Sequence, residues 1–459
     1  MIKRKAEEKL NEWLGRNNAL LISGARQVGK SFLIREWGKR HFKRFVEINL
    51  FENREWAQVV ENAKGVDDLL LRVSMMSEKE LIEGDTLIFF DEIQCAKKAD
   101  LVTLSKFLVQ DGRYRYIFSG SLLGVSLNNV LSWPVGYMEE IAMYPLDFEE
   151  FLWAVGVNPA VLTHLRDCFA AKKPVDNLIH SKIIDIYYKY LLIGGMPEAV
   201  ETFIKTNDLK KVNKVQNNIN SFYVKDITQY AEAKQKVHLE RIYDLLPEEL
   251  NSKNKRFSLS DIGKDKQIAG IEDDFMWLTK AGIAIPAFNV DTPASPLLLA
   301  RNSRLVKLFA SDVGLLSYRL MDTEVQLKLL NKSKDINYGA IFENAVAQEL
   351  ASHRFSSLYY FNSKKQGEVD FLLEYGGEVL PIEVKSGKAY KRHSALDNLL
   401  FNNDYQIKQA IVFSCANLEV KEKIIYLPIY MTMFLRKKEE INANLKIDLS
   451  DINAKFKEP

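Results

Sequence analysis

The stretch at positions 19–31, ALLISGARQVGKS, limits the fold of this chain more than any other part of the sequence. A short apolar run leads into the pattern Gly24-x4-Gly29-Lys30-Ser31, and a helix-like segment follows. Strand, glycine-rich loop and helix in this order are what a phosphate-binding loop requires. Strand-like and helix-like segments alternate over roughly the first 150 residues, which predicts an α/β domain whose parallel sheet is covered by helices.

The glycine-rich loop predicts a nucleotide site. Glycines let backbone N–H groups turn inward around phosphates, and the N-terminus of the following helix adds partial positive charge. Lys30 would reach the β- and γ-phosphates of ATP, and the Ser31 hydroxyl would ligate Mg²⁺. The residues expected to bind the nucleotide are Gly24, Ala25, Arg26, Gln27, Val28, Gly29, Lys30, Ser31 and Phe32. For Arg26, a surface ion pair is the alternative to a phosphate contact.

A second motif, TLIFFDE at positions 86–92, supports the first. Its consecutive apolar residues indicate a buried parallel strand whose C-terminal end delivers two carboxylates. Asp91 would hold Mg²⁺ through water, and Glu92 would orient the attacking water and accept its proton. The alternative is that this acidic pair caps a helix after a core strand. Ser119 follows another strand-like run, where its hydroxyl could sense the γ-phosphate as part of the nucleotide site or cap a helix.

Composition limits the class of protein. With 459 residues, the chain is long enough for two or three domains. Its net charge of +2 gives no general argument for nucleic-acid binding, so any basic surface must be local. Cys95, Cys168 and Cys415 lie far apart, which indicates neither a disulfide framework nor a zinc site. Because neither a signal peptide nor a membrane-spanning apolar run is recognisable, we expect a cytoplasmic protein without a membrane partner.

The middle of the chain is dominated by helical patterns, which begin near Asp147 and continue to the break GGMPE at positions 194–198. Between residues 237 and 290, a compact succession of helical and strand-like segments predicts a winged helix. Such modules bind DNA or act as protein–protein adaptors. The acidic run at positions 272–274, in the expected recognition helix, would repel phosphate, so the adaptor role is favoured.

A second group of charged residues lies near the C-terminal end, where two strand-like runs, 367–374 and 379–385, flank a Gly-Gly turn. This pattern predicts a two-residue β-hairpin. In that hairpin Asp370 lies directly opposite Glu383, in a pair whose Cβ atoms are about 5 Å apart. Lys385 shares the face of Glu383, because side chains two apart in a strand point to the same side.

Two facing carboxylates are unfavourable unless a cation lies between them or one of them binds a proton. Asp370 and Glu383 therefore predict a Mg²⁺ site, with Lys385 as a catalytic residue beside it, able to polarise a phosphodiester and activate water. Glu343, in a preceding helical pattern, could add a third carboxylate to the metal site. The alternative is an exposed hairpin whose charges pair among themselves.

The spacing of Glu343, Asp370, Glu383 and Lys385 resembles the PD-(D/E)XK nuclease signature. The chain as a whole, over about residues 5–435, resembles the bacterial and archaeal AAA-type P-loop ATPases that carry a C-terminal nuclease-like domain of unknown function. The motifs that carry this resemblance are, in order, GARQVGKS, FFDEIQ, YPLDFEEF, GGMPEA, SDVGLL and IEVKSG.

The resemblance implies three domains: a P-loop ATPase domain over residues 1–170, a helical and winged-helix region over 171–325, and an α/β restriction-endonuclease-like domain over 326–459. The chain departs from the pattern at Gly136-Tyr137, where many relatives have an arginine or lysine after the glycine. The resemblance therefore supplies no cationic contact with the γ-phosphate from this loop.

Taken together, these patterns predict an ATP-binding protein that hydrolyses ATP with Mg²⁺ and is coupled to a nuclease-like domain acting on or binding DNA. No arginine finger is recognisable, which predicts slow turnover that a regulatory protein or a second copy of the chain could raise. An alternative is a slow ATP-dependent signalling switch whose C-terminal domain is a non-catalytic protein-interaction module. A third is a DNA-binding module without catalysis.

Overall fold

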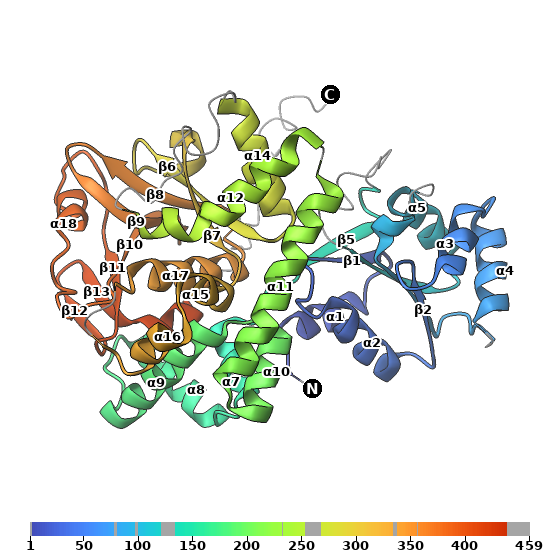
Figure 1. The fold of residues 1–459 in the computed structure, drawn as a ribbon, viewed down its shortest axis with the longest axis horizontal. Helices are drawn as coiled ribbons and strands as arrows, with labels where there is room; N and C mark the ends of the chain where they lie inside the picture. The colour runs from blue at the N-terminus through green and yellow to red at the C-terminus, as the bar shows by residue number, and fades with distance from the viewer. Residues whose placement is uncertain are drawn as a thin grey trace, which may run out of the picture.

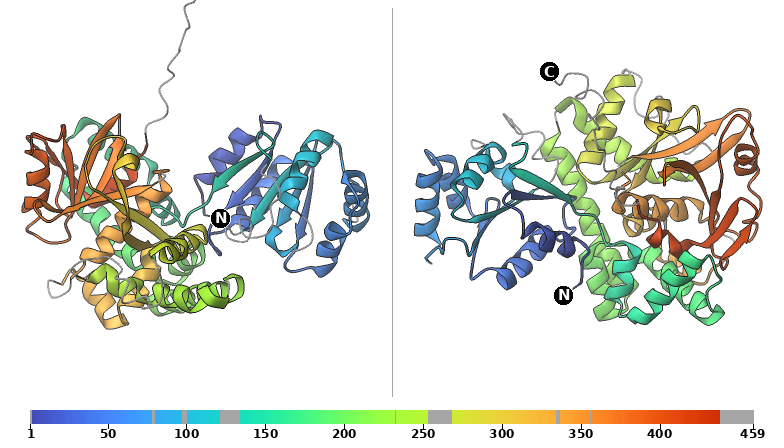
Figure 2. Two further views of the ribbon diagram at one scale, coloured as in Figure 1. Left: turned by 90° about the horizontal axis from the view of Figure 1, so that it is seen from above. Right: turned by 180° about the vertical axis from the view of Figure 1, so that it is seen from behind.

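The computed structural model describes residues 2–77, 80–96, 100–120, 134–231, 233–252, 268–333, 337–355 and 357–437. Two β-sheets form the centres of two lobes, and the long helix α11 (Leu209–Tyr230) lies between them (Figure 1). The two lobes are also separate in the views from above and from behind (Figure 2). In the described part of the chain, no helix is both long and apolar enough to cross a membrane.

The N-terminal lobe contains a five-stranded sheet in the order β2-β3-β4-β1-β5. Its neighbouring strands all pair in parallel, as the alternation of strands and helices predicts. The strands expected at positions 19–22, 45–50, 87–90 and 114–119 are confirmed as β1 to β4. The strand bounds are β1 Ala19–Ser23, β2 Arg44–Asn49, β3 Thr86–Asp91, β4 Arg115–Gly120 and β5 Met138–Ala142.

Helices cover both faces of this sheet, so alternate side chains of one strand enter different cores. In β1, Leu20 and Ile22 belong to one buried cluster, while Ala19 and Leu21 belong to the other. The cluster that contains Leu20 continues into the C-terminal lobe, so the two lobes share apolar contacts. The covering helices are α1 Ala6–Trp13, α2 Lys30–His41, α3 Arg54–Glu61, α4 Val66–Met76 and α5 Leu101–Asp111, with the short η1 at Ile93–Cys95.

The middle of the chain is helical, as predicted. The helix α10 begins with Pro197 at its first position, where proline's missing N–H has no helical partner to lose. The winged-helix prediction depends on residues 253–267, which lie outside the described residues, and is not confirmed. The helices are α7 Phe148–Ala154, α8 Pro159–Ala171, α9 Asn177–Ile193, α10 Pro197–Thr206, α11 Leu209–Tyr230, α12 Ala233–Asn251 and α14 Ile268–Lys280.

The C-terminal lobe contains a mixed eight-stranded sheet in the order β12-β13-β11-β10-β9-β8-β6-β7. Parallel pairs join β6 to β8, β10 to β11, and β11 to β13, while the other pairs are antiparallel. The strands are β6 Ala284–Val290, β7 Arg301–Ala310, β8 Leu358–Ser363, β9 Gly367–Tyr375, β10 Glu378–Val384, β11 Ala410–Ser414, β12 Glu419–Lys421 and β13 Ile424–Pro428. The other elements of this lobe are α15 Val313–Leu320, α16 Thr323–Leu330, α17 Gly339–Ser352, α18 Ser394–Leu400, η2 Leu297–Ala300 and η3 Ile429–Phe434.

This sheet extends across the boundary that we expected at residue 326. The strands β6 and β7 come before that boundary, yet β6 pairs in parallel with β8, which comes after it. The segment expected to end a winged helix is therefore part of the C-terminal sheet. Its long-range pairing has no local sequence signal, because periodicity shows that a strand exists but not which strand it joins.

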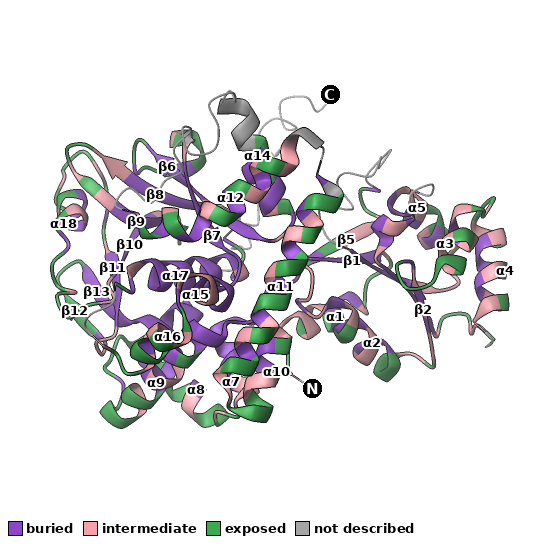
Figure 3. Cartoon of the chain, viewed as in Figure 1, coloured by how far each residue is buried: buried purple, intermediate pink, exposed green. Residues whose placement is uncertain are grey.

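The helix α17 lies inside the C-terminal lobe, and Figure 3 shows it buried along its length. Its buried polar side chains hydrogen-bond to neighbouring backbone. Asn344 pairs with both the N–H (2.7 Å) and the C=O (3.0 Å) of Ala310, and Gln348 accepts from the N–H of Val313 (2.7 Å). These bonds satisfy the polar groups that burial removes from water, and they fix α17 against the sheet.

Candidate nucleotide site

The phosphate-binding loop joins β1 to α2 and depends on glycines with left-handed backbone angles. Gly24 has a φ of +143° and Gly29 a φ of +91°, angles that L-residues rarely adopt. A Cβ atom on Gly24 would also lie 2.2 Å from the carbonyl oxygen of Met143, next to β5. Both glycines therefore stand where the turn and its neighbours require them. Between them, Gln27 also has a positive φ, of 66°.

The Lys30 side chain lies inside the loop. Its Nζ donates to the carbonyl oxygens of Gly24 (2.9 Å) and Ala25 (2.8 Å). Burial lowers the pKa of Lys30, while the charges of Glu92 and Asp91 partly oppose that effect. The backbone of the phosphate-binding loop therefore binds the Lys30 ammonium group.

Asp91 lies at the C-terminal end of β3, and side chains from three neighbouring segments donate hydrogen bonds to its carboxylate. The Ser31 hydroxyl donates to Asp91 Oδ1 (3.0 Å), and the Ser119 hydroxyl at the end of β4 donates to the same oxygen. Burial raises the pKa of Asp91, and the two serine hydroxyls oppose the rise. The C-terminal ends of parallel strands meet at one edge of a sheet, which is where such sheets bind ligands.

Asn49 is a residue of this site that sequence reasoning missed. It ends β2, is paired in register with Asp91, and its Nδ2 lies 3.5 Å from Asp91 Oδ2. Its position could have indicated this role, because the last residue of a strand next to β3 lies at the same edge of the sheet as Asp91.

Glu92 has a left-handed backbone angle, φ 55°, which is uncommon for a residue other than glycine. Its carboxylate accepts from the Gln94 side-chain amide, and its backbone N–H donates to Asp91 Oδ1 (3.1 Å). This turn directs the two carboxylates to different partners: Asp91 accepts from Ser31, and Glu92 accepts from Gln94. Sequence reasoning gave no role to Gln94, although it is the last residue of the FFDEIQ motif.

Three further residues of the loop segment differ in their surroundings. Arg26 pairs with Asp226 of α11, with 2.5 Å between Nη1 and Oδ1, so the ion-pair alternative is the one observed. Val28 is buried, and its carbonyl oxygen accepts from Arg4 Nη1 (2.9 Å). Phe32, on the first turn of α2, is 51% exposed.

The comparisons with known proteins identify this lobe. Residues 16–152 match the family model described as "AAA domain". The chain carries an AAA-type P-loop ATPase domain. It is an ATPase, and the predicted phosphate loop and acidic strand end both lie within the matched residues. The other two matches, residues 184–326 and 338–431, are to domains of unknown function (DUF8612 and DUF4143).

Solved structures that resemble the chain are distant from it. The Walker-type ATPase PABY2304 of Pyrococcus abyssi is 15% identical, with 70% of this chain and 96% of that chain covered and a TM-score of 0.42. The Aeropyrum pernix ORC1 protein in complex with DNA is 14% identical, with 72% and 93% covered and a TM-score of 0.29. Among curated proteins, none matches the chain. The assignment of the ATPase domain therefore rests on the family model and on the site geometry.

Outside the ATPase domain, the predicted hairpin has the expected register. Pro381 pairs with Leu372 and Ile382 with Phe371, which continues to Asp370 opposite Glu383. Lys385 Nζ lies 2.5 Å from Glu383 Oε1, and Asp370 Oδ2 accepts from the backbone N–H of Val384 (2.8 Å).

The carboxylates of this group are buried rather than exposed, contrary to the exposed-hairpin alternative. Glu343 on α17, Asp370 on β9 and Glu383 on β10 are at most 7% exposed. Burial and the charge of Asp370 raise the pKa of Glu383 to about 8, although Lys385 opposes the rise. Among the described residues, however, these three do not place three ligand atoms within 4.8 Å of one another.

One buried cluster in the described residues does bring three such atoms together: Asp147, Glu349 and His353. Lys5 already supplies a cation there, because its ammonium group pairs with Asp147 and with Glu149 (2.8 Å). His353 Nε2 lies 3.5 Å from Asp147 Oδ2. We therefore assign this cluster a structural role, in which the N-terminal segment, α7 and α17 are joined by charge pairs.

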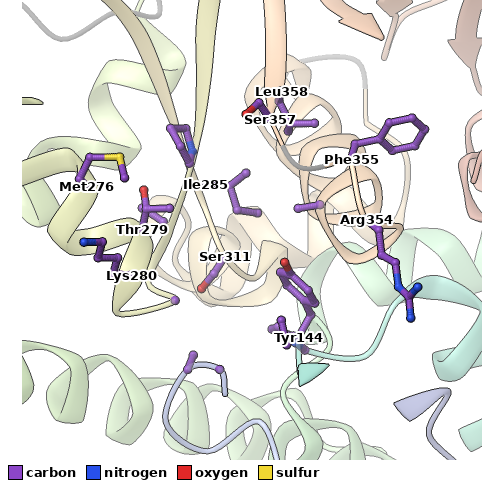
Figure 4. A pocket seen from close by; sticks show the side chains of 18 of the residues that line it. Tyr144, Met276, Thr279, Lys280, Ile285, Ser311, Arg354, Phe355, Ser357 and Leu358 are labelled. Atoms are coloured by element: carbon purple, nitrogen blue, oxygen red, sulfur yellow. The ribbon is translucent and has the colours of Figure 1, made fainter. Parts of the chain in front are cut away.

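A cavity of about 300 Å³ lies between the ATPase domain and the C-terminal lobe. Gly24 and Ala25 of the phosphate loop line one side of it. Figure 4 shows Thr279 and Lys280 entering from α14 and Tyr144 from the segment after β5. The phosphate loop is therefore bordered by the rest of the chain and does not lie on a free domain surface.

Proposed function

We propose that the ATPase domain binds ATP in the Gly24–Phe32 loop and hydrolyses it with Mg²⁺. The observation that carries this proposal is the hydrogen bond between Ser31 and Asp91 (3.0 Å) beside the loop-bound Lys30. A hydroxyl and a carboxylate are the hard oxygen donors that Mg²⁺ prefers, so Ser31 and Asp91 fit such an ion. When bound, Mg²⁺ would neutralise charge on the β- and γ-phosphates.

In this proposal each residue has one task. Backbone N–H groups of the loop cradle the phosphates, and Lys30 moves from its two carbonyl partners to the β- and γ-phosphates. Glu92 orients the attacking water and accepts its proton, while Gln94 holds the Glu92 carboxylate in position. The Ser119 hydroxyl, which donates to Asp91, lies where the γ-phosphate can be sensed.

Phosphate release by purified protein tests this assignment. Lys30→Ala is expected to abolish ATP turnover, and Glu92→Gln to lower it by roughly 10²- to 10⁴-fold, the usual contribution of a general base. Glu83→Gln, an exposed acid in the same domain, serves as the matched control. Turnover that survives Lys30→Ala would contradict the proposed site.

We further propose that the C-terminal lobe is a nuclease-like domain, with Glu343, Asp370 and Glu383 as metal ligands and Lys385 as the catalytic residue, acting on or binding DNA. The order α17, β8, β9, β10, α18, β11 and the facing pair on β9 and β10 support this proposal. Carboxylate oxygens suit Mg²⁺, and the raised pKa of Glu383 is the expected response of a buried acid beside another when no cation lies between them.

Incubation with supercoiled plasmid, Mg²⁺ or Mn²⁺, and ATP tests the nuclease proposal. Nicking that disappears in Asp370→Ala but persists in Asp404→Ala, an exposed acid of the same lobe, is the expected result. Nicking by both variants alike would indicate a contaminant and would contradict the assignment.

A specific observation favours the alternative, a slow signalling switch whose C-terminal lobe binds a protein without catalysis. In the described part of the chain, the carboxylates of Glu343, Asp370 and Glu383 do not place three ligand atoms within 4.8 Å of one another, and Lys385 is paired with Glu383. A protein with measurable ATP turnover, no nicking and no salt-sensitive DNA affinity would be this switch. A regulatory protein or a second copy of the chain would then supply the missing arginine finger.

We also propose a reducing compartment such as the cytoplasm. None of the three cysteines, Cys95, Cys168 and Cys415, forms a disulfide in the structure. Free thiols persist where the glutathione and thioredoxin systems keep cysteine reduced.

A further inference from the structure

The helix α11 contacts the phosphate-binding loop, although the two segments are far apart in the sequence. Arg26 of the loop and Asp226 of α11 are 200 positions apart in sequence, yet 2.5 Å separates Arg26 Nη1 from Asp226 Oδ1. The two side chains are 26% and 16% exposed, so the pair is largely withdrawn from solvent. One turn earlier on the helix, the Tyr223 hydroxyl lies 3.5 Å from the Arg26 carbonyl oxygen.

The turn before β6 also packs closely against this loop. The turn between α14 and β6 contains Gly282, whose φ is +73°. A Cβ atom there would lie 2.8 Å from the backbone nitrogen of Ala25. The helix α11 and the turn before β6 therefore both contact the loop, at Arg26 and at Ala25.

Asp226 is held by Arg26, a side chain of the phosphate-binding loop itself. In a phosphate-binding loop the γ-phosphate lies between the loop lysine and the Mg²⁺ held by the serine and the acidic strand end. Burial raises the pKa of Asp226; the charges of Arg26 and Lys30 oppose the rise, and that of Glu92 adds to it. A carboxylate that pairs with an arginine of the loop, and whose charge interacts with Lys30 and Glu92, would compete with a bound γ-phosphate for that arginine.

We propose that Arg26 and Asp226 form a γ-phosphate-reading pair: Arg26 exchanges the Asp226 carboxylate for the γ-phosphate of ATP, and α11 is released from the loop. This inference rests on the proposed ATP site. ADP lacks the competing phosphate and leaves the pair closed. The pair thereby discriminates ATP from ADP, and α11 carries the difference toward the C-terminal lobe, against which it packs through α15.

Nucleotide affinities test the exchange. The probes are Mg-ADP and the Mg²⁺ complex of the non-hydrolysable analogue adenylyl imidodiphosphate, titrated calorimetrically. Asp226→Asn is expected to tighten the analogue by roughly tenfold while changing ADP little, a coupling of the usual size for linked sites. Arg26→Ala is expected to weaken the analogue by a similar factor and again to spare ADP. Asp185→Asn, which removes the acid of an exposed ion pair with Lys332 on the C-terminal lobe, is the matched control.

Hydrogen exchange on the unmodified protein gives an independent readout. The backbone amides of α11 near Tyr223 and Asp226 are expected to exchange faster with the ATP analogue than with ADP. If the wild-type protein binds neither nucleotide, the proposed function fails and the pair has nothing to read. If it binds both, but Asp226→Asn behaves as Asp185→Asn does and α11 exchanges equally with each nucleotide, the exchange of partners is refuted while the ATP site stands.

Discussion

Replacing Asp147 with asparagine should reveal how strongly charge joins the two lobes. The Asp147 carboxylate pairs with Lys5 from the N-terminal segment and faces His353 of α17 at 3.5 Å. It also caps α7, because Oδ1 accepts from the backbone N–H of Glu150 (2.8 Å). Asparagine keeps the cap and removes the charge, whereas alanine removes both.

The size of the effect follows from these contacts. Removing one partner of a buried ion pair costs about 3–5 kcal/mol. Lys5 keeps Glu149 at 2.8 Å, so we expect the lower end, about 3 kcal/mol, for Asp147→Asn. Loss of an N-cap adds about 1 kcal/mol, which gives about 4 kcal/mol for Asp147→Ala. Either value is a large fraction of the roughly 5–15 kcal/mol that stabilises a folded domain.

Urea unfolding of the variants measures both numbers. Asp176, an exposed N-cap of α9, supplies the control pair. There asparagine should cost almost nothing and alanine about 1 kcal/mol, because the cap is lost without a buried charge. A loss below about 1 kcal/mol for Asp147→Asn would refute the claim that the buried charge stabilises the junction.

The effect also depends on pH in a defined direction. Burial raises the pKa of Asp147, but Lys5 and His353 outweigh burial and hold that pKa below its usual range. A depressed carboxyl pKa contributes stability that is present above the ordinary value of about 4 and is lost as the pH falls toward the folded-state pKa. The difference between wild type and Asp147→Asn should therefore shrink below about pH 4.

Three further predictions concern the loop, the acidic strand end and a buried acid of the C-terminal lobe. Gly24→Ala should abolish Mg-ATP binding measured by calorimetry, because the new Cβ would lie 2.2 Å from the Met143 carbonyl oxygen and Gly24 has a φ of +143°. Gly84→Ala, at a turn with open space around it, is the control and should leave binding intact. Gln94→Ala should lower kcat roughly tenfold and leave nucleotide affinity unchanged, because it positions Glu92 rather than binding phosphate; weakened binding instead would contradict that role. Burial raises the pKa of Asp312 to about 6, so its contribution to stability is present below about pH 4 and is lost as the pH rises through 6. Asp312→Asn should therefore gain about 3 kcal/mol relative to wild type between pH 4 and pH 7, as measured by urea unfolding at each pH.

The sequence was sufficient where structure depends on local pattern. The strands β1 to β4 could be predicted because parallel strands buried on both faces appear as short apolar runs. The register of the β9–β10 hairpin could be predicted because a two-residue turn fixes which residues face each other. That Lys30, Ser31 and Asp91 lie together could be predicted, because a phosphate loop and the neighbouring strand end meet at one sheet edge; their roles remain a proposal.

The sequence was insufficient where structure depends on contacts between distant segments. The strands β6 and β7 were expected in the helical and winged-helix region, but β6 also pairs with β8, which comes almost 50 residues after β7, beyond α17. Arg26 remained ambiguous between phosphate and ion pair, because its partner on α11 is 200 positions away. Asn49 and Gln94 were missed because each has an ordinary role as the last residue of a strand or as a helix residue.

The glycines, Lys30 and the Asp91–Ser31 pair are what any loop needs to bind a triphosphate, and they say nothing about what the nucleotide controls. Beyond these parts, two segments of this chain contact the loop: Asp226 pairs with Arg26, and Gly282 packs against Ala25. These contacts connect the loop to elements that lead into the C-terminal lobe, so they offer a route by which a bound γ-phosphate would act on that lobe. The non-local contacts are therefore where an ATPase with this common motif acquires its own output.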